Sequence, residues 1–238
     1  SVEGVDVTAA SLTVNATRLM SSEAVVRGLS VATTMGVGAS VATVQISSDV
    51  RAFAGGAGAT FTLGSLSVAA RLAASSGRDL SDVQAYASGG GLLLGVQSTN
   101  ATSTNRATVL SGLTGGNFSV SGALAVSADA TGRQYAKSRG IAGGLVGIGA
   151  TDATLTSLST VNSTVSANTT VVYAGSMKLA AAAVDENYLD IEAGAFGLAS
   201  GAAAKGTTNS NSSVFTGFLD GTSTSNRALV TVAGTLSL

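Results

Sequence analysis

The sequence predicts an all-β, repetitive β-solenoid, either a parallel β-helix or a flattened β-roll, built from about four units of about 56 residues. Three observations predict this class. A strand motif recurs at near-constant spacing, charged residues gather at one phase of each repeat, and a Gly/Ala-rich, uncharged stretch follows them. The chain also contains no Pro, and its corners are rich in Gly.

The recurring motif reads apolar-x-apolar, a small turn, and apolar-x-apolar again. Its copies are Val5-x-Val7 with Leu12-x-Val14, Phe61-x-Leu63 with Leu66-x-Val68, Phe118-x-Val120 with Leu124-x-Val126, Val171-x-Tyr173 with Met177-x-Leu179, and Val230-x-Val232 with Leu236-x-Leu238. The second halves begin 54, 58, 53 and 59 residues apart. We therefore expect Leu12, Leu66, Leu124, Met177 and Leu236 to lie over one another as a ladder along the long axis.

The spacing of this motif also predicts the domain organisation. Residues 1–238 are expected to form one continuous array, with units 5–60, 61–117, 118–170 and 171–229 and the start of a fifth at 230–238. The array begins and ends at the same phase without a divergent capping unit, and solenoids need polar caps. This favours an interior slice of a longer array.

Two segments test the strand interpretation. Residues 29–41 alternate bulky and small side chains with period two, which predicts a strand whose small face lies either close to another sheet or in solvent. Residues 179–194 have high helix propensity, but they occupy a phase that is poor helix sequence in the other units, so a strand is expected there too. A chain of antiparallel β-sandwiches is the rival fold, and it needs about 100 residues and larger side chains per unit.

The first unit carries a family resemblance. Its elements are Gly38-Ala39-Ser40-Val41-Ala42, Val50-x-Ala52, Gly58-Ala59-Thr60 and Leu66-x-Val68-x-Ala70. They resemble the repeats of giant bacterial filamentous adhesins, which include haemagglutinin-like exoproteins of two-partner secretion and leukotoxin-type filamentous adhesins. The resemblance implies an exported rod at a bacterial surface, and it transfers no catalytic residue.

Composition excludes several classes. The formal net charge is −1 with scattered Lys and Arg, so no basic stripe for nucleic acid is present. The apolar stretches are too short for a transmembrane helix. The chain has no Cys or His, and no calcium loop is recognisable, so no cofactor or metal is expected.

Four carboxylates are the only catalytic candidates. Asp185, Glu186, Asp190 and Glu192 could provide a pair for glycoside hydrolysis. They lie, however, in the charged phase that every unit contains, so a solvated face is expected instead. The sequence thus predicts that the protein is not an enzyme.

Two polar features complete the candidates. Sequons begin at Asn15, Asn100, Asn117, Asn162, Asn168 and Asn211, and those at Asn100, Asn162 and Asn211 lie in loop-like phases that suit glycosylation. The Thr-rich tracts 98–105 and 221–226 are similar to Thr arrays on ice-binding solenoids. Their offsets from the strand motifs differ, so a regular array is not expected.

The predicted function is a rod segment of a long, secreted bacterial surface adhesin or extracellular filament. Its partners would be neighbouring repeats of the same or like chains, and surface glycans or other cells. A self-assembling fibre subunit and a solenoid-scaffold polysaccharide enzyme remain the alternatives.

Overall fold

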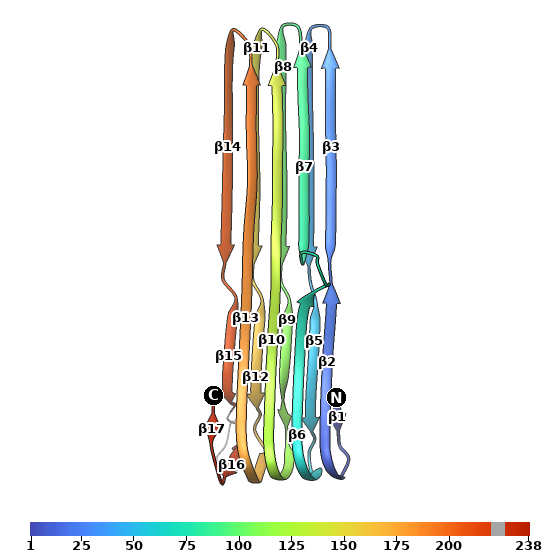
Figure 1. Ribbon diagram of the computed structural model, residues 1–238, viewed down its shortest axis with the longest axis vertical. Coiled ribbons are helices and arrows are strands. Elements are labelled where there is room, and N and C mark those ends of the chain that lie inside the picture. Colours follow the sequence, from blue (N-terminus) through green and yellow to red (C-terminus); the bar gives the residue numbers. More distant parts are fainter. Residues whose placement is uncertain (220–226) are drawn as a thin grey trace.

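The molecule is a tall, thin blade whose chain runs repeatedly up one side and down the other (Figure 1). This computed structural model describes residues 1–219 and 227–238, which form seventeen β-strands and no helix. We call each circuit of the chain a coil, with an ascending and a descending limb. The strand interpretation of residues 179–194 is confirmed, because they lie within strand β13.

The limbs follow the chain in order. The ascending strands are β2 (Val7–Met20) with β3 (Ser22–Ala32), β6 (Thr60–Ala74) with β7 (Ser81–Gly91), β10 (Gly116–Gly143), β13 (Thr169–Phe196), and β16 (Leu229–Val232) with β17 (Leu236–Ser237). The descending strands are β1 (Val2–Glu3), β4 (Met35–Ile46) with β5 (Asp49–Gly55), β8 (Leu94–Asn105) with β9 (Thr108–Thr114), β11 (Val146–Ser157) with β12 (Thr160–Val165), and β14 (Ala199–Ser210) with β15 (Ser213–Phe218).

Three sheets result from the stacking of these limbs. The ascending limbs form one sheet, and the descending limbs form an upper sheet, β14-β11-β8-β4, and a lower sheet, β1-β5-β9-β12-β15. Every strand pairing among the described residues is parallel. The predicted all-β, repetitive, parallel-sheet fold is therefore confirmed, and its architecture is solenoid-like.

The expected ladder of anchor residues is present. Leu12 pairs with Leu66, Leu66 with Leu124, Leu124 with Met177, and Met177 with Leu236. The prediction from their spacing is confirmed.

The motif itself was interpreted wrongly in one respect. In the second, third and fourth copies its two halves are not separate strands joined by a turn, because β6, β10 and β13 run through both of them. In the fifth copy the halves do form separate strands, β16 and β17. The small residues between the halves form an irregularity in the ladder, where the register shifts between Val120 and Leu124. Gly64 lies there in β6, and a Cβ on it would meet the Ala10 carbonyl oxygen at 2.4 Å. Glycine at this place thus indicates close backbone approach rather than a turn.

The ends of the motif also differ from the prediction. Val7, not Val5, pairs with Phe61, and Ala174, not Tyr173, pairs with Val120. In both units the apolar pattern alone could not show which residue the register selects.

Large side chains fill the lower part of the blade. Phe61 and Phe118 stack at a ring-centroid distance of 4.6 Å, and both are fully buried. They belong to a cluster, called the lower core below, that includes Leu66, Leu124 and Met177 and extends through the stacked coils.

At the upper end of the blade the small side chains face inward and the bulky ones face outward. We call this end the tip and define it by the uncharged segments 28–41, 87–99, 140–151 and 193–204. Buried glycines face inward there, and a Cβ on Gly89 would meet the Val96 carbonyl oxygen at 1.8 Å. A Cβ on Gly38 would likewise meet the Ser88 carbonyl oxygen at 2.2 Å, so the two sheets touch backbone to backbone.

The expectation for residues 29–41 is therefore confirmed in part. The segment is extended, but a turn at Thr33 and Thr34 divides it into the end of β3 and the start of β4. Of the two environments considered for its small face, the closely packed one is present. The bulky face points to solvent, and Leu29 is 79% exposed.

Above the lower core lies a smaller apolar cluster, and a buried polar seam runs through its lower part. The Ser81 and Ser103 hydroxyls are 2.6 Å apart, and the Ser103 hydroxyl donates to Oε1 of Gln134 at 2.8 Å. Nε2 of Gln134 donates to the Ser157 hydroxyl at 2.7 Å and to Oδ1 of Asn187 at 3.1 Å. The seam thus passes from one coil to the next inside the blade.

Candidate functional site

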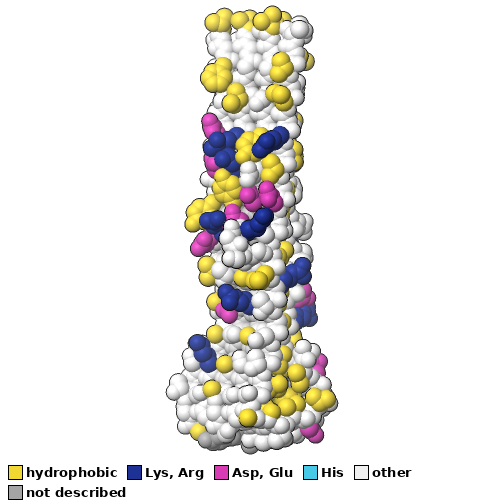
Figure 2. Space-filling model, turned by 45° about the vertical axis from the view of Figure 1, so that its right-hand side comes forward, with side chains coloured by type: hydrophobic (Ala, Val, Ile, Leu, Met, Phe, Trp, Pro, Cys, Tyr) yellow, Lys and Arg dark blue, Asp and Glu magenta, His cyan; other side chains and the backbone are white. Residues whose placement is uncertain are grey.

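Most of the ion pairs lie on the outer face of the ascending strands, below the tip (Figure 2). These pairs join neighbouring coils. Arg78 lies 3.7 Å from Glu23, and Arg133 forms an ion pair with Asp79. The charged phase of each unit is therefore a set of pairs across the coils.

Asp190 is the centre of the densest group. Its carboxylate lies 3.0 Å from Nζ of Lys137 and 3.2 Å from the Arg139 guanidinium, and the Tyr135 hydroxyl donates to it at 3.2 Å. The guanidinium of Arg139 also lies 3.3 Å from Glu192. The contact with Lys137, supported by Tyr135, holds the pKa of Asp190 below its ordinary value.

The same contact acts on the partners of Asp190. The hydrogen bond to Asp190 raises the pKa of Lys137, while burial, followed by the nearby charge of Asp190, raises the pKa of Tyr135. Asp190 therefore stays ionised and Lys137 stays protonated, and neither is prepared to exchange a proton near neutral pH.

The structure does not bring the four candidate carboxylates to one place. Alternate residues of a strand face opposite sides, so Asp185 faces the inside of the coil while Glu186, Asp190 and Glu192 face outward. Asp185 accepts hydrogen bonds from the Ser210 and Ser212 hydroxyls, at 3.3 and 2.5 Å. A glycosidase needs a carboxylic acid with a raised pKa beside a second carboxylate. Asp190 has the opposite shift.

Arginines also lie over the rings of two tyrosines of this face. The guanidinium of Arg27 lies 5.4 Å from the ring centre of Tyr86, and that of Arg133 lies 5.6 Å from the ring centre of Tyr188. Tyr86, Arg139 and Glu192, from three successive coils, line a hollow of about 280 Å³. The arrangement offers a shallow, mixed-charge surface.

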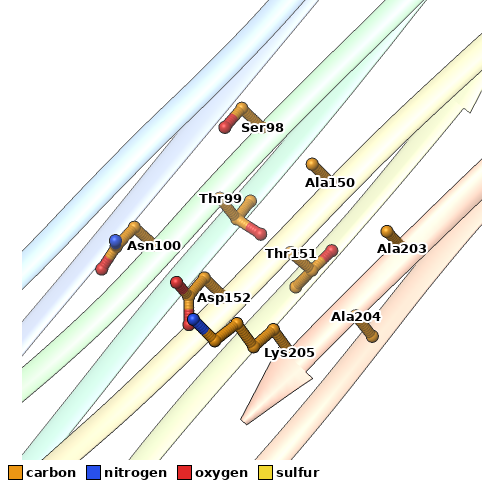
Figure 3. Close-up of a pocket in the computed structure, with 9 residues that line it drawn as sticks. All are labelled: Ser98, Thr99, Asn100, Ala150, Thr151, Asp152, Ala203, Ala204 and Lys205. Atoms are coloured by element: carbon orange, nitrogen blue, oxygen red, sulfur yellow. The ribbon is translucent and has the colours of Figure 1, made fainter. Parts of the chain in front are cut away.

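The outer face of the descending strands carries a second hollow, of about 350 Å³ (Figure 3). Asn100, Asp152 and Lys205 stand in one row across β8, β11 and β14. Oδ1 of Asp152 is buried without a hydrogen-bond partner. Sequence analysis missed this row, because its members are 52 and 53 residues apart and belong to different motifs.

The three preferred sequons fall at different kinds of position. Asn211 lies between β14 and β15 and is exposed, as a loop position requires. Asn100 and Asn162 lie inside β8 and β12, so the expectation that they occupy loops is wrong. Oδ1 of Asn162 is buried without a partner.

The Thr-rich tract at 98–105 also departs from its expectation. It stacks in register on residues 150–157, which pairs Thr102 with Thr154 and Thr104 with Thr156. Thr43 and Thr207 extend the first of these rows on either side. A regular Thr row therefore does form. The other tract, 221–226, lies outside the described residues.

The described residues offer neither a metal cluster nor a membrane-spanning helix. Among residues 1–219 and 227–238, no three His, Cys, Asp or Glu side chains stand close enough to share a metal ion. Within the same residues there is no helix with the length and hydropathy to cross a membrane. Comparison with protein-family models, curated proteins and solved structures found no match.

Proposed function

We propose that this chain is a non-catalytic rod segment of a long bacterial surface protein, and that it contributes length and outer surface to an exported adhesin or filament. In its detailed form the rod is a β-solenoid of about four repeated units. One observation carries the proposal: limb after limb pairs in parallel with its equivalent in the next coil, so the blade grows along one axis. The resemblance of residues 38–70 to filamentous adhesin repeats supports the bacterial surface as the location.

The outer face supports the same proposal. Asp190 and Glu192 contact Lys137 and Arg139 from the preceding coil. Charges that neutralise each other between coils serve stacking, and a surface repeated in every coil suits many weak contacts better than one tight site.

Localisation and catalysis give separate tests. Antibodies raised against the purified chain should label intact cells of the source organism, and labelling only after the cells are permeabilised would overturn the surface proposal. The purified chain should not hydrolyse common polysaccharides. Turnover that is lost in Asp190→Asn, and retained in the matched surface variant Asp82→Asn, would establish the enzyme alternative.

One observation favours a self-assembling fibre as a second function. Within residues 1–219 and 227–238, strand β14 pairs only with β11, and all twelve of its residues are exposed. An unpaired strand edge is a template for another chain. Sedimentation velocity over a range of concentrations should then show growing end-to-end oligomers, whereas a single species at every concentration would exclude fibre formation by this segment.

A further inference from the structure

The hollow beside Tyr86, on the outer face of the ascending strands, combines an aromatic ring with hydrogen-bonding groups. Its volume is about 280 Å³, and its lining includes Tyr86, Ser88, Arg139, Ile141 and Glu192. These residues belong to strands β7, β10 and β13, and each occupies an outward position of its strand. We call this space the Tyr86 hollow. It offers a ligand one aromatic surface and several polar groups together.

The Tyr86 hollow exists because of a short side chain in the next row toward the tip. Ser88 pairs with Leu29 of β3 on one side and with Ile141 of β10 on the other. Both neighbours are bulky, and they are 79% and 48% exposed. Ser88 therefore leaves a depression between them, and Ile141 gives this depression an apolar wall.

The ring of Tyr86 is held in place on one side. Its hydroxyl donates to Oε1 of Gln84 at 2.7 Å, and Nε2 of Gln84 donates to Asp82 at 2.9 Å. The guanidinium of Arg27 lies 5.4 Å from the ring centre, and it reaches the ring from β3. Arg27 lines a separate hollow, and β3 and β10 lie on opposite sides of β7. The ring face toward β10 thus stays open on a side chain that is already fixed, which lowers the entropic cost of binding.

Arg139 lies on this open side, but its ion pairs draw it away from Tyr86. Its guanidinium lies 3.3 Å from Glu192 and 3.2 Å from Asp190, and both carboxylates belong to β13, on the far side of β10. These contacts use Nε and Nη2 of Arg139. A guanidinium has further N–H donors on Nη1, so Arg139 can donate to a ligand without leaving its carboxylates.

We propose that the Tyr86 hollow binds one neutral sugar ring of a glycan. A pyranose ring carries C–H groups on its faces and hydroxyl groups around its rim. The C–H groups lie on the electron-rich face of Tyr86 and against Ile141. The hydroxyl groups donate to Glu192 and accept from Arg139 and Ser88. The site deepens the proposed function and rests on it for its setting, because an exported rod meets the glycans of other cells.

Charge and backbone pairing argue against the other classes of ligand. Arg139 and Glu192 share the hollow, so it has no positive excess to select a nucleic acid or an acidic polymer. A peptide cannot add as a strand, because β7 and β10 are paired on both sides at Tyr86 and Arg139. The volume lies just below the range of about 300–1,000 Å³ for pockets of drug-sized ligands, which suits a single ring.

Saturation-transfer NMR on the purified chain tests the proposal. The neutral probes are methyl β-glucoside, methyl β-galactoside and N-acetylglucosamine, and glucuronate is the charged comparison. At least one neutral sugar should receive saturation, most strongly at the C–H protons of one ring face. Its affinity, from a titration followed by NMR, should be the same at low and high salt, because the ligand carries no charge.

Two variants remove the site in different ways. Tyr86→Ala deletes the aromatic surface and should weaken binding at least about tenfold. Ser88→Leu fills the hollow from an outward position and should abolish binding with the melting temperature unchanged. The matched control is Tyr188→Ala, because Arg133 lies over Tyr188 as Arg27 lies over Tyr86, but Tyr188 lines a different hollow. This control should bind sugar as the wild type does.

Three results would overturn the proposal. They are the absence of binding by every neutral sugar, an equal loss of binding in Tyr86→Ala and Tyr188→Ala, and binding of glucuronate alone that high salt reverses. Because binding is measured on the purified chain, its outcome is separate from the antibody labelling of cells. Labelled cells together with a chain that binds no sugar would keep the rod and remove the site. Sugar binding without labelling of intact cells would do the reverse.

Discussion

The strands of the lower core and of the tip alternate bulky and small side chains in the same way, but the two regions bury opposite faces of these strands. In the lower core the bulky face points inward, with Phe61, Phe118 and Leu124 stacked between the sheets. In the tip the small face points inward, and glycines such as Gly38 and Gly89 bring the two backbones into contact. The difference teaches that side-chain volume decides the distance between the sheets, and that the period of a strand does not decide which face is buried.

Adding a side chain on the buried face of the tip should have the largest effect on stability. Gly89→Ala places a Cβ 1.8 Å from the Val96 carbonyl oxygen, so the sheets must separate, and we expect a loss of about 3 kcal/mol or more in the free energy of unfolding. Denaturant titration measures it. Gly143→Ala is the matched control, because nothing lies within 4 Å of its new Cβ, and its stability should stay near that of the wild type. Equal stability of the two variants would mean that the small face of the tip is not the packed one.

Truncating bulky side chains should give the next largest contrast. Leu124→Ala empties a fully buried position of the lower core and should cost about 2–4 kcal/mol. Val37→Ala removes a side chain that is 54% exposed and should cost about 0.5 kcal/mol or less. The same unfolding measurement decides this. Similar large losses from both variants would place Val37 inside and reverse the assignment of the faces.

The smallest expected effect on stability comes from the ion pairs of the charged face. Their contribution depends on pH, whereas those of the lower core and the tip do not. The pKa of Asp190 is lowered in the folded state, so its stabilisation is present above the unfolded value of about 3.9 and is lost as the pH falls through the folded value. The pKa of Lys137 is raised, so its stabilisation is present below about 10.4 and is lost as the pH rises through the folded value.

Melting temperatures of the wild type and Asp190→Asn measure this effect. Their small difference at neutral pH should vanish in acid, whereas the difference between the wild type and Leu124→Ala should persist. An Asp190→Asn difference that persists in acid would show that the carboxylate charge is not its cause.

Sequence alone reached the ladder of Leu12, Leu66, Leu124, Met177 and Leu236, because a parallel stack repeats its register and the register appears directly as spacing. The sequence did not predict that the tip buries its small face and exposes its bulky face. The alternation in residues 29–41 indicates a strand, but burial of one face depends on what the opposite limb presents, and that limb is distant in the chain. A signal was present in the glycines on the small face, which permit the sheets to touch.

The candidate site shows the same limit. Sequence placed the carboxylates in a charged phase common to all units, and that is where the structure has them. It could not assign Lys137 and Arg139 to Asp190, because these partners lie more than 50 residues away and long side chains can reach either neighbouring coil. Nor could it separate Asp185, whose neighbours in sequence face outward, from the other carboxylates.

Both chain ends lie at the base of the blade, on opposite ends of the stack (Figure 1). A pulling force applied to the two ends therefore enters at the base, and it acts along the hydrogen bonds between coils. Such a force opens these bonds in sequence from base to tip, so a terminal coil peels away before the next one is loaded. Each released coil of about 54 residues would lengthen the chain by about 180 Å. Under tension the blade would yield in discrete steps and lose its outer coils while the inner ones stay folded.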